Sequence, residues 1–200
     1  MKFWFGACGV LLGAMPLWAA APVAEIESML AKPKVLCGHF DQNKQLTGLR
    51  KPMVSNGRFC VVADKGVLWR TLWPFPNAVR LTRDEIVQLQ GNRVAMRLDA
   101  QHEPAVRIFN SVLFALLAGD LSQIGNLFEV DGAIHEKSWR VTLKARDPAL
   151  ARVISTVALE GGEHVKSITL SESSGDRTRI VFSRIQVGDS AMSSDEAALF

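Results

Sequence analysis

Histidine and cysteine, the residues that most often carry chemistry, are few in this sequence of 200 residues. The dipeptides His102-Glu103 and His135-Glu136 resemble fragments of a zinc site. Neither is followed by a second histidine at helical spacing, so neither makes a zinc-binding helix. The sequence also contains no Gly-x-Ser-x-Gly elbow and no phosphate-binding loop. These patterns predict a protein that is not an enzyme and that needs no metal or cofactor.

Two cysteines, Cys37 and Cys60, lie in segments that alternate like strands. If those strands pair antiparallel, the register that brings Cys37 opposite Cys60 also brings Val35 opposite Val62. A disulfide fits this register, and closing a loop of that size contributes about 3 kcal/mol of stability in the chain-entropy model. Two buried free thiols are the alternative interpretation.

Residues 1–20 have the features of a secretory signal peptide. Lys2 supplies a positive charge, residues 3–17 an apolar run, and residues 19–21 the small side chains of a cleavage site. An uncleaved anchor is disfavoured because the apolar run is short for a bilayer. We therefore expect residues 21–200 to form the mature protein, in the periplasm.

The length and composition of the mature chain are typical of a single globular domain. The hydrophobic content of 48% is enough for a core, and the sequence suggests no second domain within 21–200. The formal net charge is +3, and removal of Lys2 lowers it by one. A chain this close to neutral gives no reason to expect nucleic-acid binding.

The segment from Phe40 to Pro76 organises the rest of the chain. It is typical of three strands, separated by a long loop and by a tight turn at residues 64–66. Alternation places Phe59, Trp69 and Trp73 on one broad, apolar and aromatic face. Helices, a second sheet or a ligand must cover such a face.

The remaining periodicities predict a few helices and a large sheet. We expect helices over 22–31, 104–118 and 120–128, and a short C-terminal helix capped by Ser193 or Ser194. The helix over 104–118 is apolar around well over half its circumference, as in a helix buried on more than one side. The expected strands cover residues 34–46, 79–86, 93–98, 139–145, 155–159, 164–171 and 177–187.

Several spacings resemble those of the LolA family of periplasmic outer membrane lipoprotein carriers and its distant LolA-like branch. The matching features are a Phe-x-Gln at Phe40, Gly57 opening an alternating strand, Trp69 twelve positions on, and Pro74 five positions after it. Trp139 before another alternating strand extends the resemblance over most of the chain. The resemblance implies a mainly β (α+β) fold, an open and curved antiparallel half-barrel whose lid helices close an apolar concave face.

In such a fold the acyl cavity would be lined by the sheet and by the lid helices. The residues that we expect to line it are Phe59, Trp69, Trp73 and Phe75 from the sheet, and Phe109, Leu113, Leu116, Leu117, Leu127 and Phe128 from the helices. In the family an Arg-Pro pair follows the glycine-containing strand, and its arginine helps latch the lid. The matching positions here are Ala63 and Asp64, so Arg50, Arg58 and Arg70 become the candidates for a latch or a head-group contact.

The resemblance implies a monomeric carrier or chaperone that shelters the acyl chains of a lipid or lipoprotein without chemistry. Its expected partners are that cargo, an inner-membrane transporter and an outer-membrane acceptor. One alternative is a LolA-like module for the export or assembly of another acylated or polyene lipid. Another is a structural domain whose apolar face is a filled core.

Overall fold

The computed structural model describes residues 23–91, 93–99 and 124–200, and this part of the chain is mostly strand. The strands are β1 (Val35–Gln45), β2 (Met53–Val62), β3 (Gly66–Trp73), β4 (Asn77–Leu81), β5 (Glu85–Gln90), β6 (Arg93–Asp99), β7 (Phe128–His135), β8 (Ser138–Ala145), β9 (Ile154–Gly161), β10 (Val165–Glu172) and β11 (Arg177–Val187). The helical segments are α1 (Val23–Met29), α3 (Ile124–Leu127), α4 (Pro148–Ala151), the 3-10 turn η1 (Asp189–Ala191) and α5 (Ser194–Ala197).

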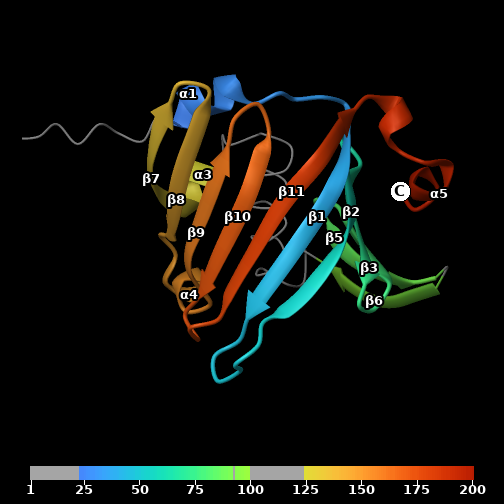
Figure 1. Cartoon of the computed structure of the whole chain (residues 1–200), viewed down its shortest axis with the longest axis horizontal. Helices are drawn as coiled ribbons and strands as arrows, with labels where there is room; N and C mark the ends of the chain where they lie inside the picture. The colour runs from blue at the N-terminus through green and yellow to red at the C-terminus, as the bar shows by residue number, and fades with distance from the viewer. Residues whose placement is uncertain (1–22, 92, 100–123) are drawn as a thin grey trace, which may run out of the picture.

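All eleven strands belong to one antiparallel sheet, in the order β6-β5-β4-β3-β2-β1-β11-β10-β9-β8-β7. Every pair of neighbours is also consecutive in the chain except β1 and β11, which join its two halves at the centre. Figure 1 shows the sheet curving between its β7 and β6 edges, with α5 beside β2 and β3. The prediction of a mainly β fold with an open, curved antiparallel sheet is confirmed.

The predicted strand over residues 79–86 is wrong, because the chain turns within it. β4 ends at Leu81 and β5 begins at Glu85. The Thr82 hydroxyl accepts hydrogen bonds from the backbone N–H groups of Asp84 (3.3 Å) and Glu85 (3.1 Å). A threonine hydroxyl that bonds its own backbone stabilises a turn. The apolar alternation on both sides concealed this turn.

The predicted helix over 120–128 ends one residue early in the structure, and its N-terminal part lies outside the described residues. α3 ends at Leu127, and Phe128 begins β7, a strand that the sequence pattern did not suggest. Arg146 fixes this junction, since its backbone N–H donates to the Leu127 carbonyl (2.9 Å) and its Nε to the Phe128 carbonyl (3.1 Å). The predicted signal peptide (1–20) and the predicted helix over 104–118 also lie outside the described residues.

Alternation along the strands divides the buried apolar residues between two faces of the sheet. We call inner face the side that carries the main core, and outer face the opposite side, against which the C-terminal segment packs. The inner-face core comprises Ile26, Leu30, Leu36, Phe40, Phe59, Val61, Val67, Leu81, Ile124, Phe128, Trp139, Val141, Leu143, Val157, Leu159, Val165, Ile168 and Phe182. The outer-face core comprises Val35, Cys37, Cys60, Val62, Leu68 and Ala191.

Candidate functional site

Four aromatic rings gather on the inner face at the centre of the sheet. The rings of Phe40 and Trp69 stack with centroids 3.9 Å apart, and those of Phe59 and Phe182 lie 4.9 Å apart. Trp69 also contacts Phe59 and meets Phe182 edge-on, with both centroid distances 6.1 Å. Offset and edge-on aromatic pairs add to the free energy of simple area burial. The rings therefore form a well-packed apolar surface across four strands.

Gly57 allows this cluster to form. It lies opposite Phe40 in the β1–β2 ladder, and the Phe40 ring covers it. A methyl group at Gly57 would collide with the backbone carbonyl of Arg70 and with the Phe40 ring. Without that methyl group, the ring reaches across the strand to stack on Trp69. Three residues whose spacing carried the resemblance, Phe40, Gly57 and Trp69, thus meet at one place.

The apolar surface continues over β7, β8 and β9, where α1 and α3 pack against it. Ile26 of α1 is fully buried and Ile124 of α3 is nearly so. A gap of about 10 Å³ remains between these helices and the sheet, which is room for about one water molecule. The gap is lined by Val23, Ile26, Ile124, Val130, Trp139, Val141, Leu143 and Leu159.

The structure places some of the predicted cavity residues together on the inner face and others elsewhere. Phe59, Trp69, Leu127 and Phe128 all belong to the inner-face core or pack against it. Two predicted residues are instead exposed at the end of β3 and in the following turn, namely Trp73 (54%) and Phe75 (79%). The remaining four, Phe109, Leu113, Leu116 and Leu117, lie outside the described residues.

Sequence reasoning did not single out two of the aromatic residues in the cluster. Phe40 was placed on one face of the strand over 34–46 and matched the family spacing, and Phe182 was part of a long alternating strand, but neither was predicted to line the cavity. Phe182 lies directly opposite Phe40 in the β1–β11 ladder. The pairing of the first strand with the last could not be seen in the local pattern, so this contact had no usable signal.

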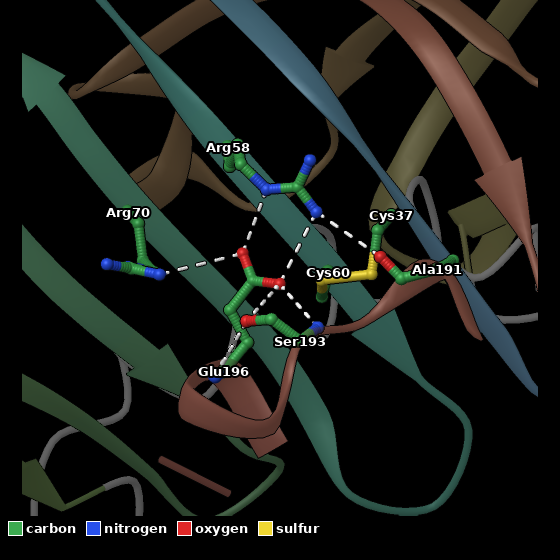
Figure 2. Close-up of a disulfide and its surroundings, with 7 residues drawn as sticks. All are labelled: Cys37, Arg58, Cys60, Arg70, Ala191, Ser193 and Glu196. Atoms are coloured by element: carbon green, nitrogen blue, oxygen red, sulfur yellow. Dashed lines mark hydrogen bonds and ion pairs between the residues drawn. A yellow bond between two sulfur atoms is a disulfide. The ribbon is translucent and has the colours of Figure 1, made fainter. Parts of the chain in front are cut away.

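On the outer face, Cys37 and Cys60 form a disulfide between β1 and β2, as Figure 2 shows. Their Cα atoms are 4.1 Å apart, and the ladder also pairs Val35 with Val62. The predicted disulfide and its register are therefore confirmed. Both cysteines are almost fully buried, and Ala191 of the C-terminal segment packs in the same cluster.

The C-terminal segment is held on the outer face by the carboxylate of Glu196, whose side chain is only 2% exposed. Arg58 donates to it through Nε (2.9 Å) and Nη2 (3.3 Å), and Arg70 forms an ion pair with it at 3.7 Å (Figure 2). Arg58 also donates to the Ala191 carbonyl at 3.3 Å. Ser193 caps α5 in a capping box with Glu196, which confirms one of the two predicted cap residues.

Two ionisable groups on the outer face have shifted pKa values. Burial alone would raise the pKa of Glu196, but hydrogen bonds from Arg58 and from the Ser193 backbone more than offset it and lower that pKa. Burial lowers the pKa of His39, and the nearby charges of Arg58 and Arg184 lower it further. Glu196 is therefore the charged partner in this cluster, and His39 is neutral at pH 7.

The three arginines considered for a latch are all away from the inner-face core. Arg58 and Arg70 hold the C-terminal segment on the outer face, and Arg50 is exposed in the β1–β2 turn. A groove of about 840 Å³ lies on the outer face beside α5. Its lining residues are Arg70, Thr71, Leu72, Pro76, Asn77, Ala78, Arg80, Leu89, Gly91, Asp195, Ala198 and Leu199.

Within residues 23–91, 93–99 and 124–200, no group of three histidine, cysteine or acidic side chains is placed to hold a metal ion. None of the helices in these ranges is long and apolar enough to cross a bilayer.

Comparisons with known proteins find a family model and similar folds that cover most of the chain. The model of the family described as "Outer membrane lipoprotein carrier protein LolA-like" matches residues 18–199. A LolA superfamily protein from Nitrosomonas europaea has 7% sequence identity and a TM-score of 0.44, over 84% of this chain and 92% of that chain. No curated protein matches the sequence significantly. The structure of the MucA/MucB complex of Pseudomonas aeruginosa contains a chain with the same fold. That structure has 15% identity and a TM-score of 0.50, covering 88% of this chain and 62% of that chain.

Proposed function

This chain belongs to the LolA-like family of outer membrane lipoprotein carrier proteins, and we propose that it shelters acyl chains between the inner face of its sheet and the helices above it. The observation that carries the proposal is the inner-face core itself. It runs without interruption from the Phe40–Trp69 stack to the strands under α1. A continuous apolar surface under short, separable helices provides the environment that an acyl chain requires.

The packing supports a mechanism in which cargo replaces the covering helices. A gap of about 10 Å³ cannot hold an acyl chain, so α1 must move for one to enter. Burying a chain of about sixteen carbons contributes up to about 12 kcal/mol before the costs of ordering are subtracted. Contacts that Ile26 of α1 and Leu30 just after it lose on opening offset part of that gain. The resulting smaller net affinity allows a carrier to release its cargo.

The same mechanism makes a specific experiment possible. We expect Ile26→Ala to weaken the closed state and to tighten the binding of a palmitoyl probe about tenfold for each 1.4 kcal/mol of lost closure energy. Leu68→Ala is the matched control, because Leu68 is as deeply buried but lies on the outer face. It should lower stability without changing probe affinity. Native mass spectrometry of the protein purified after export would identify the natural cargo.

The opposite outcome would support the second candidate, a structural domain with a filled core. The small size of the gap under α1 favours that candidate. If neither the wild-type protein nor Ile26→Ala binds fatty acids, phospholipids or lipopeptides, the inner face is a core and the carrier proposal fails. A polyene or other acylated lipid in the native mass spectrum would instead identify an export or assembly module.

The proposal extends to location, partners and chemistry. We propose a periplasmic protein, exported by a cleaved signal peptide, that acts as a monomer between an inner-membrane transporter and an outer-membrane acceptor. Membership of a family of outer membrane lipoprotein carriers supports this route. The disulfide fits an oxidising compartment. Sheltering an acyl chain needs no catalytic residue, so we propose no enzymatic activity.

A further inference from the structure

The exposed apolar side chains of the described residues are concentrated in and beside two turns. Six of the eleven large hydrophobic side chains that are exposed there belong to the β1–β2 turn and the start of β2, or to the end of β3 and the turn after it. We call these residues the turn patch. They are Leu49 (51%), Met53 (57%), Val54 (44%), Leu72 (46%), Trp73 (54%) and Phe75 (79%).

The register of the sheet brings these residues to one end. Val54 pairs with Asn43 near the end of β1, and Asn56 pairs with Trp73 at the end of β3. The β1–β2 and β3–β4 turns therefore leave the sheet in the same direction from neighbouring strands. Figure 1 shows the β1–β2 turn projecting beyond the sheet at the end opposite α1. Strand β6 begins at this same end, and its first residues include the exposed Val94 and Met96.

Between them, the two turns beside the turn patch carry basic side chains and no acidic ones, and the nearest exposed carboxylate from α5, Asp195, lines the same groove as Leu72 and Pro76. No aspartate or glutamate occurs in residues 42–63, 67–83 or 86–98. Arg50 and Lys51 are exposed within the β1–β2 turn, and Arg93 is exposed where β6 begins. At the opposite end of the sheet the pattern is different, because each of four turns carries an exposed acidic residue. Those residues are Asp64, Asp84, Glu136 and Glu163.

Three acidic residues of other elements lie at the same end of the sheet, and each of them has a partner there. Asp176 accepts a hydrogen bond from the Thr47 backbone (2.7 Å), and that bond lowers its pKa. Glu172 forms an ion pair with Lys44 at 3.3 Å. Asp147 accepts from the Leu150 backbone (3.0 Å) at the start of α4. None of the three belongs to the two turns themselves, so Arg50 and Lys51 give these turns their charge.

From these observations we propose that the turn patch docks the protein on an anionic lipid surface. Tryptophan and phenylalanine are favoured at the boundary between lipid headgroups and acyl chains. Lysine and arginine beside them are attracted to anionic headgroups. Trp73 and Phe75 would enter the interface while Arg50 and Lys51 contact lipid phosphates. This inference goes beyond the proposed function, because an empty protein would bind vesicles without using its inner face.

The test is cosedimentation of the exported protein with vesicles of phosphatidylcholine alone or with about 30% phosphatidylglycerol. We expect binding to the anionic vesicles only. Arg50→Gln with Lys51→Gln should weaken it about fivefold for each charge removed. Trp73→Ser with Phe75→Ser should weaken it at least about tenfold. Circular dichroism would verify that the variants are folded.

The opposite end of the sheet supplies matched controls. Lys65→Gln with Arg83→Gln removes two exposed cations from other turns, and Val187→Ser removes an exposed apolar side chain. We expect these variants to bind like the wild-type protein. Brominated lipids should also quench wild-type tryptophan fluorescence, and Trp73→Phe should abolish that quenching while keeping the binding.

Three results would overturn the proposal: no binding of the wild-type protein to anionic vesicles, equal losses in the control variants, or unchanged binding in both patch variants. None of them would affect the acyl-chain proposal, which is tested in solution with a palmitoyl probe. Conversely, vesicle binding by a protein that takes up no probe would establish the docking surface alone.

Discussion

Glu196 is a buried acidic side chain that holds the C-terminal segment on the outer face. Its carboxylate lies on a buried helix end between two guanidinium groups, Arg58 and Arg70. A buried carboxylate depends on its partners, because removing hydrogen bonds to a charged group costs more than removing neutral ones. We therefore expect Glu196→Gln to lower the free energy of unfolding by about 2 kcal/mol at pH 7, measured by urea denaturation.

The pH dependence of this loss follows from the direction of the pKa shift. The pKa of Glu196 is lowered in the folded protein from an ordinary value of 4.5, so its stabilising contribution is fully present above pH 4.5. That contribution is lost as the pH falls through the folded-state pKa. The difference between wild type and Glu196→Gln should therefore be largest near neutral pH and should shrink in acid. Asp195→Asn, a charge loss at an exposed position of the same helix, is the control.

A difference in the free energy of unfolding that stays constant from neutral pH into acid would show that Glu196 contributes by shape and not by charge.

At the scale of single residues, the sequence predicted part of this arrangement. It named Ser193 or Ser194 as the cap residue, and Arg58 and Arg70 among the candidates for a latch or a head-group contact. It could not predict that both arginines meet Glu196, because Arg58 and Glu196 are separated by 138 positions and are joined only by the folded sheet.

At the scale of the elements, Gly57 decides how closely β1, β2 and β3 pack. A side chain there would meet the Arg70 carbonyl and the Phe40 ring. Overpacking of a well-filled core typically lowers the free energy of unfolding by about 1–3 kcal/mol. Because the added methyl group would meet backbone, we expect Gly57→Ala to cost about 3 kcal/mol. Urea denaturation would give this value, and near-ultraviolet circular dichroism would report the disturbed Phe40–Trp69 stack.

Gly125→Ala is the matched control for this prediction. Gly125 lies in α3, and a methyl group added there meets nothing within 4 Å. Alanine also has the higher helix propensity, so the control should be neutral or slightly stabilising. Equal stabilities of the two variants would contradict the view that a close approach of strands requires Gly57.

The elements that the sequence predicted well are those with a complete local signal. Alternation and turn residues gave β11 at residues 177–187, and the positions of Cys37 and Cys60 gave the β1–β2 register. Two failures have a physical reason. The turn between β4 and β5 contains no glycine or proline and is closed by backbone and hydroxyl hydrogen bonds between Thr82 and Glu85. Strand β7 follows α3 without an intervening loop, so the change of period at Phe128 was hidden.

At the scale of the whole molecule, the disulfide joins β1 and β2 near the centre of a sheet of eleven strands. The two cysteines are 23 positions apart, and the chain-entropy model gives about 3 kcal/mol for a loop of this length. We expect Cys37→Ser with Cys60→Ser to lose about that much stability. Urea denaturation of the variant and of the wild type, each with and without dithiothreitol, measures it. Dithiothreitol should affect only the wild type, and no difference between the two proteins would contradict the prediction.

The two faces of the sheet should respond differently to a ligand. If an acyl chain displaces α1, hydrogen exchange should accelerate in residues 23–29 when a palmitoyl probe binds, because those amides lose their packing. The outer-face segment 189–197 is attached through Glu196 and Arg58 and should keep its protection. Slower exchange in both segments would show that the ligand tightens the whole fold and would contradict displacement. Faster exchange confined to α1 would show that the inner face opens as a separate unit while the ion pairs of Glu196 keep the C-terminal segment on the outer face.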